Sequence, residues 1–90
     1  MKLYEFTLLT TNEQAQIIKL SATYITERKE ERYTFKLYQI DDFYIEEKWY
    51  TAFNERREIS CFTSVAKLQP YFEVIDITSL LGCTGNNINA

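Results

Sequence analysis

Histidine is absent from this 90-residue sequence, and glycine occurs only twice. Without histidine, Ser-His-Asp and Cys-His catalysis, histidine metal sites and the commonest general base near neutral pH are excluded. Both glycines, Gly82 and Gly85, stand near the end of the sequence, so no glycine-rich loop can hold a phosphate group. The sequence also has no C-x-x-C pair and no EF-hand spacing. We therefore expect no enzyme activity, no metal and no cofactor.

Long apolar runs and an excess of positive charge are missing as well. No apolar run approaches the roughly 18 residues that a membrane span needs, and residues 1–9 are too short and polar for a signal peptide. These features predict a cytoplasmic protein, with Cys61 reduced and buried and Cys83 in a polar tail. The formal net charge of −3 lacks the electrostatic footprint of a duplex-DNA binder.

The length and the single proline predict one folded domain with little loop. We expect an α+β domain over residues 1–82 and a disordered polar tail over residues 83–90. A chain of this size buries roughly 60–65% of its extended surface, which is enough for one modest core.

Aromatic residues concentrate in one stretch, residues 33–53, which holds eight of the Phe, Tyr and Trp side chains. Two strand-like runs flank Asp41-Asp42, so this stretch predicts a β-hairpin. A two-residue turn would pair Leu37 with Glu46 and would mix apolar and polar faces. We therefore predict a three-residue loop, residues 40–42, that pairs Leu37 with Ile45 on an apolar face.

The segments before the hairpin are shorter and less regular. Residues 3–8 alternate like a strand, and Thr11 is a predicted N-cap, with Gln14 at the capping-box position, for a helix over residues 12–20. A strand over residues 22–26 follows. The competing interpretation joins residues 17–25 into one long strand, because that run is rich in β-branched side chains.

Two charged runs, residues 27–32 and 54–58, predict solvated turns, and residues 59–62 predict a last short strand. Residues 64–76 then have helical spacing, with a kink or a break expected at Pro70. The predicted buried stripe of this helix comprises Val65, Leu68, Phe72 and Ile75.

Together these elements predict an α+β fold in the order β-α-β-β-β-β-α. The sheet is antiparallel, with four to five strands, because strands that are close in sequence pair as hairpins. The helices are expected to pack on one face of this sheet.

Three groups of residues are candidates for a site. Asp41-Asp42 is more typical of a turn than of a metal site, because further ligands are missing. Glu46 and Glu47 point to opposite faces of a strand and cannot act on one atom. Glu47 falls on the predicted apolar face beside Trp49, which makes it a possible buried acid.

The third group is a predicted outward face of the hairpin that is unusually aromatic. Its residues are Lys36, Tyr38, Tyr44, Lys48 and Tyr50. Exposed aromatic patches mark interaction surfaces, so the leading hypothesis is a non-catalytic interaction or regulatory module that forms a homodimer or binds another protein. Two alternatives are a sheet that stacks single-stranded nucleic acid and a small ligand-binding domain or enzyme that uses Glu47.

Overall fold

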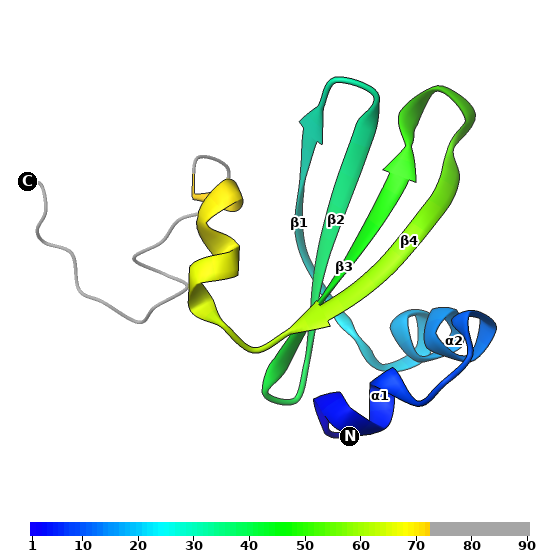
Figure 1. The fold of residues 1–90 in the computed structure, drawn as a ribbon, viewed down its shortest axis with the longest axis vertical. Helices are drawn as coiled ribbons and strands as arrows, with labels where there is room; N and C mark the ends of the chain where they lie inside the picture. The colour runs from blue at the N-terminus through cyan, green and yellow to red at the C-terminus, as the bar shows by residue number, and fades with distance from the viewer. Residues whose placement is uncertain (73–90) are drawn as a thin grey trace, which may run out of the picture.

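The structure, a computed structural model, describes residues 1–72. Its centre is a four-stranded antiparallel sheet in the order β1-β2-β3-β4, which confirms the predicted α+β class with an antiparallel sheet. The strands are β1 (Thr23–Glu30), β2 (Tyr33–Ile40), β3 (Phe43–Tyr50) and β4 (Glu55–Phe62). Figure 1 shows these strands as a twisted meander, with the two N-terminal helices near its lower end and the helical segment after β4 to its left. The predicted tail and the predicted end of the domain at residue 82 lie outside the described residues.

The element order begins with two helices, α1 (Leu3–Thr7) and α2 (Thr11–Ser21), so the strand predicted over residues 3–8 is wrong. In α1 the Lys2 amide donates to Glu5 Oε1 at 2.8 Å, a capping contact that alternation of side chains does not reveal. Of the three alternating residues Tyr4, Phe6 and Leu8, only Phe6 is fully buried, and the other two side chains are mostly exposed.

The helix predicted over residues 12–20 is present as α2, but its capping box starts one residue earlier than predicted. Thr10 Oγ1 accepts a hydrogen bond from the Glu13 amide at 3.2 Å, and Glu13 Oε1 accepts one from the Thr10 amide at 2.9 Å. Thr10 rather than Thr11 is therefore the N-cap, and Glu13 takes the position that was assigned to Gln14.

Both charged runs are mainly strand rather than turn. Residues 27–30 continue β1 and residues 55–58 begin β4, which leaves Glu31 and Asn54 in turns with positive φ of 48° and 49°. A run of charged residues fits an outer strand as well as a turn. An outer strand has one edge without a partner strand, and charged side chains are common there.

The central hairpin is in the predicted place but in the register that was rejected. Leu37 lies opposite Glu46 and Phe35 lies opposite Lys48, around a two-residue turn in which Asp41 has a φ of 51°. The prediction assumed that only one face of the sheet is apolar. In fact both faces carry a core, so the mixed pairs are tolerated.

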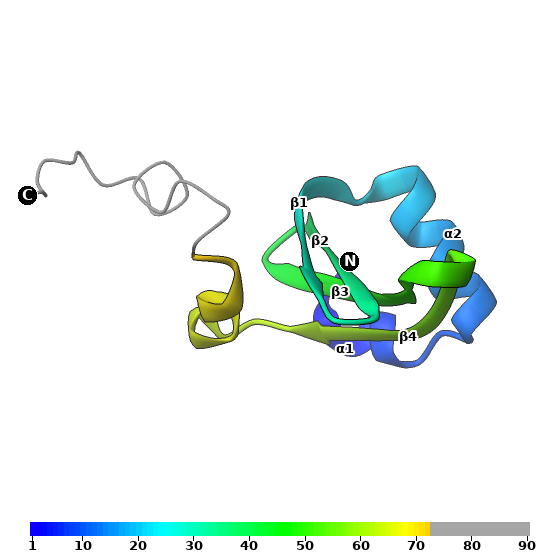
Figure 2. The ribbon, with the colours of Figure 1, turned by 90° about the horizontal axis from the view of Figure 1, so that it is seen from above.

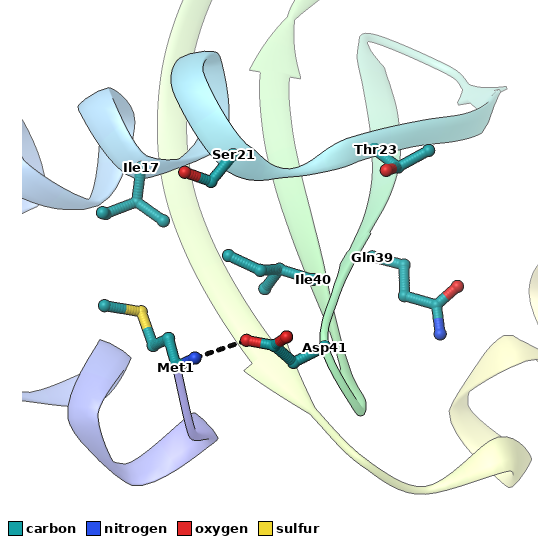
Figure 3. Close-up of a pocket in the computed structure, with 7 residues that line it drawn as sticks. All are labelled: Met1, Ile17, Ser21, Thr23, Gln39, Ile40 and Asp41. Carbon is teal, nitrogen blue, oxygen red and sulfur yellow. Dashed lines mark hydrogen bonds and ion pairs between the residues drawn. The ribbon is translucent and has the colours of Figure 1, made fainter.

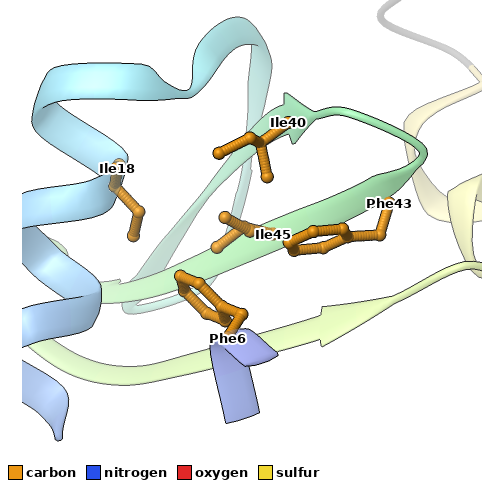
Figure 4. Close-up of a cluster of buried hydrophobic side chains, with 5 residues drawn as sticks. All are labelled: Phe6, Ile18, Ile40, Phe43 and Ile45. Carbon is orange, nitrogen blue, oxygen red and sulfur yellow. The ribbon is translucent and has the colours of Figure 1, made fainter. Parts of the chain in front are cut away.

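The first face, here called the α face, packs against α1 and α2. Its buried core is drawn in Figure 4, where side chains from both helices meet the central hairpin; the residues are Phe6, Ile18, Ile40, Phe43 and Ile45. Phe6 and Phe43 are in aromatic contact, with ring centroids 5.8 Å apart. Burial of each of these large side chains contributes roughly 1.5–3 kcal/mol.

The opposite face, here called the η face, packs against a 3₁₀ helix, η2 (Val65–Tyr71). Its buried residues are Leu37, Phe62, Leu68 and Tyr71. Helical elements therefore cover both faces rather than one, and the views of Figures 1 and 2 place η2 away from α1 and α2.

The predicted C-terminal stripe is correct at one position and incomplete at others. Leu68 is fully buried and Phe72 is half-buried, but Val65 is 49% exposed, and Ile75 lies outside the described residues. Tyr71, which the stripe omits, is fully buried. The reason is the helix type, since a 3₁₀ helix has three residues per turn and aligns Leu68 with Tyr71. Pro70 lies inside this single helix and does not divide it over the described residues.

Candidate functional site

The register separates the five residues of the predicted outward face. Lys36 lies opposite Glu47 and Tyr38 opposite Ile45, on the α face. Tyr44, Lys48 and Tyr50 belong to the η face. The grouping of all five on one surface is therefore wrong, because it depended on the three-residue loop.

Tyr44 is also separated from Lys48 and Tyr50 along the η face. It stacks on Phe62, with ring centroids 5.6 Å apart, and packs against the core below η2. Lys48 and Tyr50 lie at the other end of the strand, near the turns. Of the five predicted residues, only these two remain together, at the end of the sheet that bears the turns, and both are half-buried.

This end of the sheet carries a row of aromatic rings, here called the aromatic ladder. It consists of Phe35, Tyr33, Tyr50 and Phe53. Successive ring centroids are 6.4, 5.9 and 5.3 Å apart, within the range of favourable aromatic pairs. Figure 1 shows the end of the sheet that bears the two turns projecting beyond the helical elements. Phe53, in the short 3₁₀ helix η1 (Thr51–Phe53), is 74% exposed.

Cationic side chains lie over three rings of the aromatic ladder. Arg28 is 4.1 Å from the centroid of Phe35, Lys48 Nζ is 4.4 Å from Tyr33, and Arg57 is 4.9 Å from Tyr50. Each such contact contributes roughly 0.5–1 kcal/mol at an exposed position. The rings are therefore held in fixed positions, and the surface combines apolar area with positive charge.

Acidic side chains flank the same surface. Arg28 Nη1 pairs with Glu30, Arg57 Nε is 3.3 Å from Glu55 Oε1, and Glu58 lies opposite Lys48 in the register. Both signs of charge are therefore present beside the aromatic ladder.

A buried polar cluster fixes η2 to the η face. Tyr71 Oη donates a 2.6 Å hydrogen bond to Glu46 Oε2, and Arg28 Nη2 lies 3.7 Å from the same oxygen. Burial, together with the hydrogen bond to Glu46, raises the pKa of the Tyr71 hydroxyl. Arg28 thus connects this cluster to the aromatic ladder through Phe35.

Glu47 is on the α face with 4% of its surface exposed. Its Oε1 accepts hydrogen bonds from Tyr38 Oη at 2.9 Å and Trp49 Nε1 at 3.1 Å, and Arg56 Nη1 is 3.6 Å from its Oε2. Burial and the Glu47 contact raise the pKa of the Tyr38 hydroxyl. A carboxylate that accepts two hydrogen bonds and lies beside a guanidinium is fixed in place, and its charge is partly balanced. Glu46 lies on the opposite face, so the two acids cannot act together.

Asp41 of the hairpin turn accepts a hydrogen bond from the Met1 amino group. Met1 and Asp41 line a hollow of about 570 Å³ together with Ile17, Ser21 and Gln39. Figure 3 shows the ion pair among these residues. Within residues 1–72 there is no group of three or more His, Cys, Asp or Glu side chains arranged to hold a metal ion.

No protein-family model matches this sequence, and comparison with curated proteins and with solved structures gives no match. None of the helices described among residues 1–72 has the length and apolar composition to cross a membrane. The two faces of the sheet and the side chains on them are therefore the guide to function.

Proposed function

We propose that this protein is a small, non-catalytic interaction module that self-associates by pairing its aromatic ladder with that of a second copy. The observation that carries the proposal is the row of four aromatic rings at this end of the η face, of which Phe53 is 74% exposed and the other three are half-buried. Contiguous apolar surface of this kind marks protein contacts, and rigid aromatic anchors supply most of the energy in such interfaces.

A second copy is the favoured partner because the flanking charges are self-complementary. In a two-fold interface each residue meets the same surface of its partner. Lys48 of β3 lies beside the rings, and Arg57 stands between Glu55 and Glu58 on β4, so both signs of charge are available to an antiparallel arrangement of two copies. A patch of one sign would repel its own copy.

Pairing through the strand edges is disfavoured by the same sequence features. The outer strands β1 and β4 carry the charged runs of residues 27–30 and 55–58, and charged edges oppose strand addition. The face of the sheet is therefore the better surface for association.

The experiment is sedimentation velocity or light scattering over about 10 µM to 1 mM, a range that detects moderate to weak dimers. Phe53→Glu places a charge at the most exposed ring of the aromatic ladder without touching a core. Leu20→Glu is the matched control, because Leu20 is 75% exposed on α2, away from the aromatic ladder. We expect a dimer for the wild type and the control, and a monomer for Phe53→Glu.

A wild type that stays monomeric at 1 mM would refute self-association, as would a dimer that Phe53→Glu leaves unchanged. Single-stranded nucleic acid is the competing ligand of an aromatic surface. Retention of a fluorescent oligothymidine at low salt, lost on Lys48→Glu, would support that alternative function instead.

A further inference from the structure

A hollow of about 510 Å³ opens on the α face, between α2 and the sheet, on the opposite side from the aromatic ladder. Its volume is within the range of small-molecule sites, which is roughly 300–1,000 Å³. All four strands and one helix contribute side chains to its walls. Among the residues that line it are Gln16, Lys19, Tyr24, Tyr38, Trp49 and Arg56.

Arg56 provides the hollow with hydrogen-bond donors that the protein leaves largely unused. Within residues 1–72 its one ion pair is the 3.6 Å approach of Nη1 to Glu47 Oε2, and it donates no shorter hydrogen bond. Its side chain is 25% exposed, so the guanidinium is partly open to water. A guanidinium has five N–H donors in a planar fork, and that fork matches a carboxylate.

Glu47 holds Arg56 in place but is itself fully engaged. Its other oxygen accepts from Tyr38 and Trp49, so Glu47 is a positioning residue rather than a free ligand group. The guanidinium also lies 5.8 Å from the Trp49 ring, which adds a second restraint on its orientation.

The charge of the hollow favours an anion with one negative charge. Arg56 and Lys19 are cationic and Glu47 is the one acid among the lining residues. A cation would find the charge of Glu47 already partly balanced and the Trp49 ring already covered, because Lys36 Nζ lies 4.6 Å from its centroid.

The remaining walls are mainly apolar. Tyr24 and Tyr38 form an edge-to-face pair with centroids 5.8 Å apart, and Ile18, Ala15 and Ala22 close the side formed by α2. We propose that this hollow binds a small aromatic carboxylate, with the carboxylate on Arg56 beside Lys19 and the ring against the tyrosine pair.

The test uses benzoate as the probe and Trp49 as the reporter. Trp49 is the single tryptophan of the chain, so its indole N–H gives one assignable signal in a ¹H–¹⁵N spectrum. We expect benzoate to shift this signal saturably, with a Kd on the order of millimolar for so small a ligand. Benzyl alcohol and benzylamine, which keep the ring and replace the carboxylate, should bind at least tenfold more weakly.

Arg56→Met should weaken benzoate binding at least tenfold. The matched control is Arg57→Met, because Arg57 is the next residue in sequence but stacks on Tyr50 on the η face. That variant should change the benzoate Kd less than twofold. Should Arg56→Met fail to fold, the comparison of benzoate, benzyl alcohol and benzylamine on the wild type still tests whether the hollow selects a carboxylate.

Three results would overturn the proposal: no saturable shift with benzoate, equal binding of benzyl alcohol, or preferential binding of benzylamine. Loss of benzoate binding in both arginine variants would also overturn it, since the effect would then not depend on the hollow. The outcome is independent of self-association, because the hollow and the aromatic ladder lie on opposite faces.

Discussion

Replacement of Glu47 by leucine tests whether the buried acid is a structural anchor of the sheet. The side chain is 4% exposed and accepts hydrogen bonds from Tyr38 and Trp49. Glu47→Leu keeps the approximate volume but leaves both donors without an acceptor. A buried donor without a partner costs about 1–3 kcal/mol.

The lower end of that range applies here, because both donors belong to side chains that are only half-buried. Arg56 can turn toward water and adds little. We therefore expect Glu47→Leu to lower the free energy of unfolding by about 2 kcal/mol. For a domain with a total stability on the order of 5 kcal/mol, that is a large fraction.

The assay is urea unfolding followed by far-UV circular dichroism, since Trp49 fluorescence responds directly to the loss of its partner. With a slope of about 1 kcal/mol per molar urea for a domain of this size, the midpoint should fall by roughly 2 M. Glu47→Gln keeps one acceptor oxygen but places an N–H donor toward Arg56. Its urea midpoint should therefore lie between those of the wild type and Glu47→Leu.

A double-mutant cycle with Tyr38→Phe isolates the hydrogen bond. In the wild-type background Tyr38→Phe should cost about 1 kcal/mol, and in the Glu47→Leu background it should cost nothing, which gives a coupling energy of about 1 kcal/mol. Equal stability of Glu47→Leu and the wild type, or the same Tyr38→Phe effect in both backgrounds, would refute this account of Glu47.

Two further predictions concern a strained turn and the response to alkaline pH. Glu31 is exposed with a φ of 48°, a conformation that glycine adopts without steric cost, so Glu31→Gly should stabilise the protein by about 0.5–1 kcal/mol in thermal or urea unfolding. If Glu31→Ala stabilises the protein equally, the gain does not come from relief of the positive φ. The folded-state pKa values of Tyr38 and Tyr71 are raised, mainly by burial and then by hydrogen bonds to Glu47 and Glu46. The unfolded chain releases these protons near pH 10 while the folded protein retains them, so their stabilisation is complete below about pH 10 and is lost as the pH rises further. From pH 9 to pH 11 the urea midpoint should therefore fall less in Tyr38→Phe or Tyr71→Phe than in the wild type. An equal fall in all three proteins would contradict the raised pKa values of the two tyrosines.

The fold was predictable where a local signal was strong. The turn at Asp41-Asp42 stands between two aromatic runs, and the structure has a hairpin there. The helix after Thr10 was placed within a residue or two, because its apolar spacing and capping residues agree. The helix at Leu3–Thr7 was missed because five residues are too few for periodicity to distinguish a helix from a strand.

The site was less predictable, because it depends on which face each strand presents. A shift of one residue in the hairpin moved Lys36 and Tyr38 to the α face and joined Tyr50 to Tyr33 and Phe53 in the aromatic ladder. Glu47 could be singled out from its position between apolar neighbours. Its cationic neighbour could not, because Arg56 lies beside it only through the pairing of β4.

The sequence by itself determined that histidine-based chemistry is excluded, that an aromatic hairpin is present, and which residues make up its two strands. These follow from residue types and short-range spacing, which do not change with the tertiary arrangement. The tertiary structure decided the register, the covering of both sheet faces, and the neighbours of Glu47 and Tyr50. Each of these depends on contacts between distant segments, and an error of one residue in pairing exchanges the two faces of a strand.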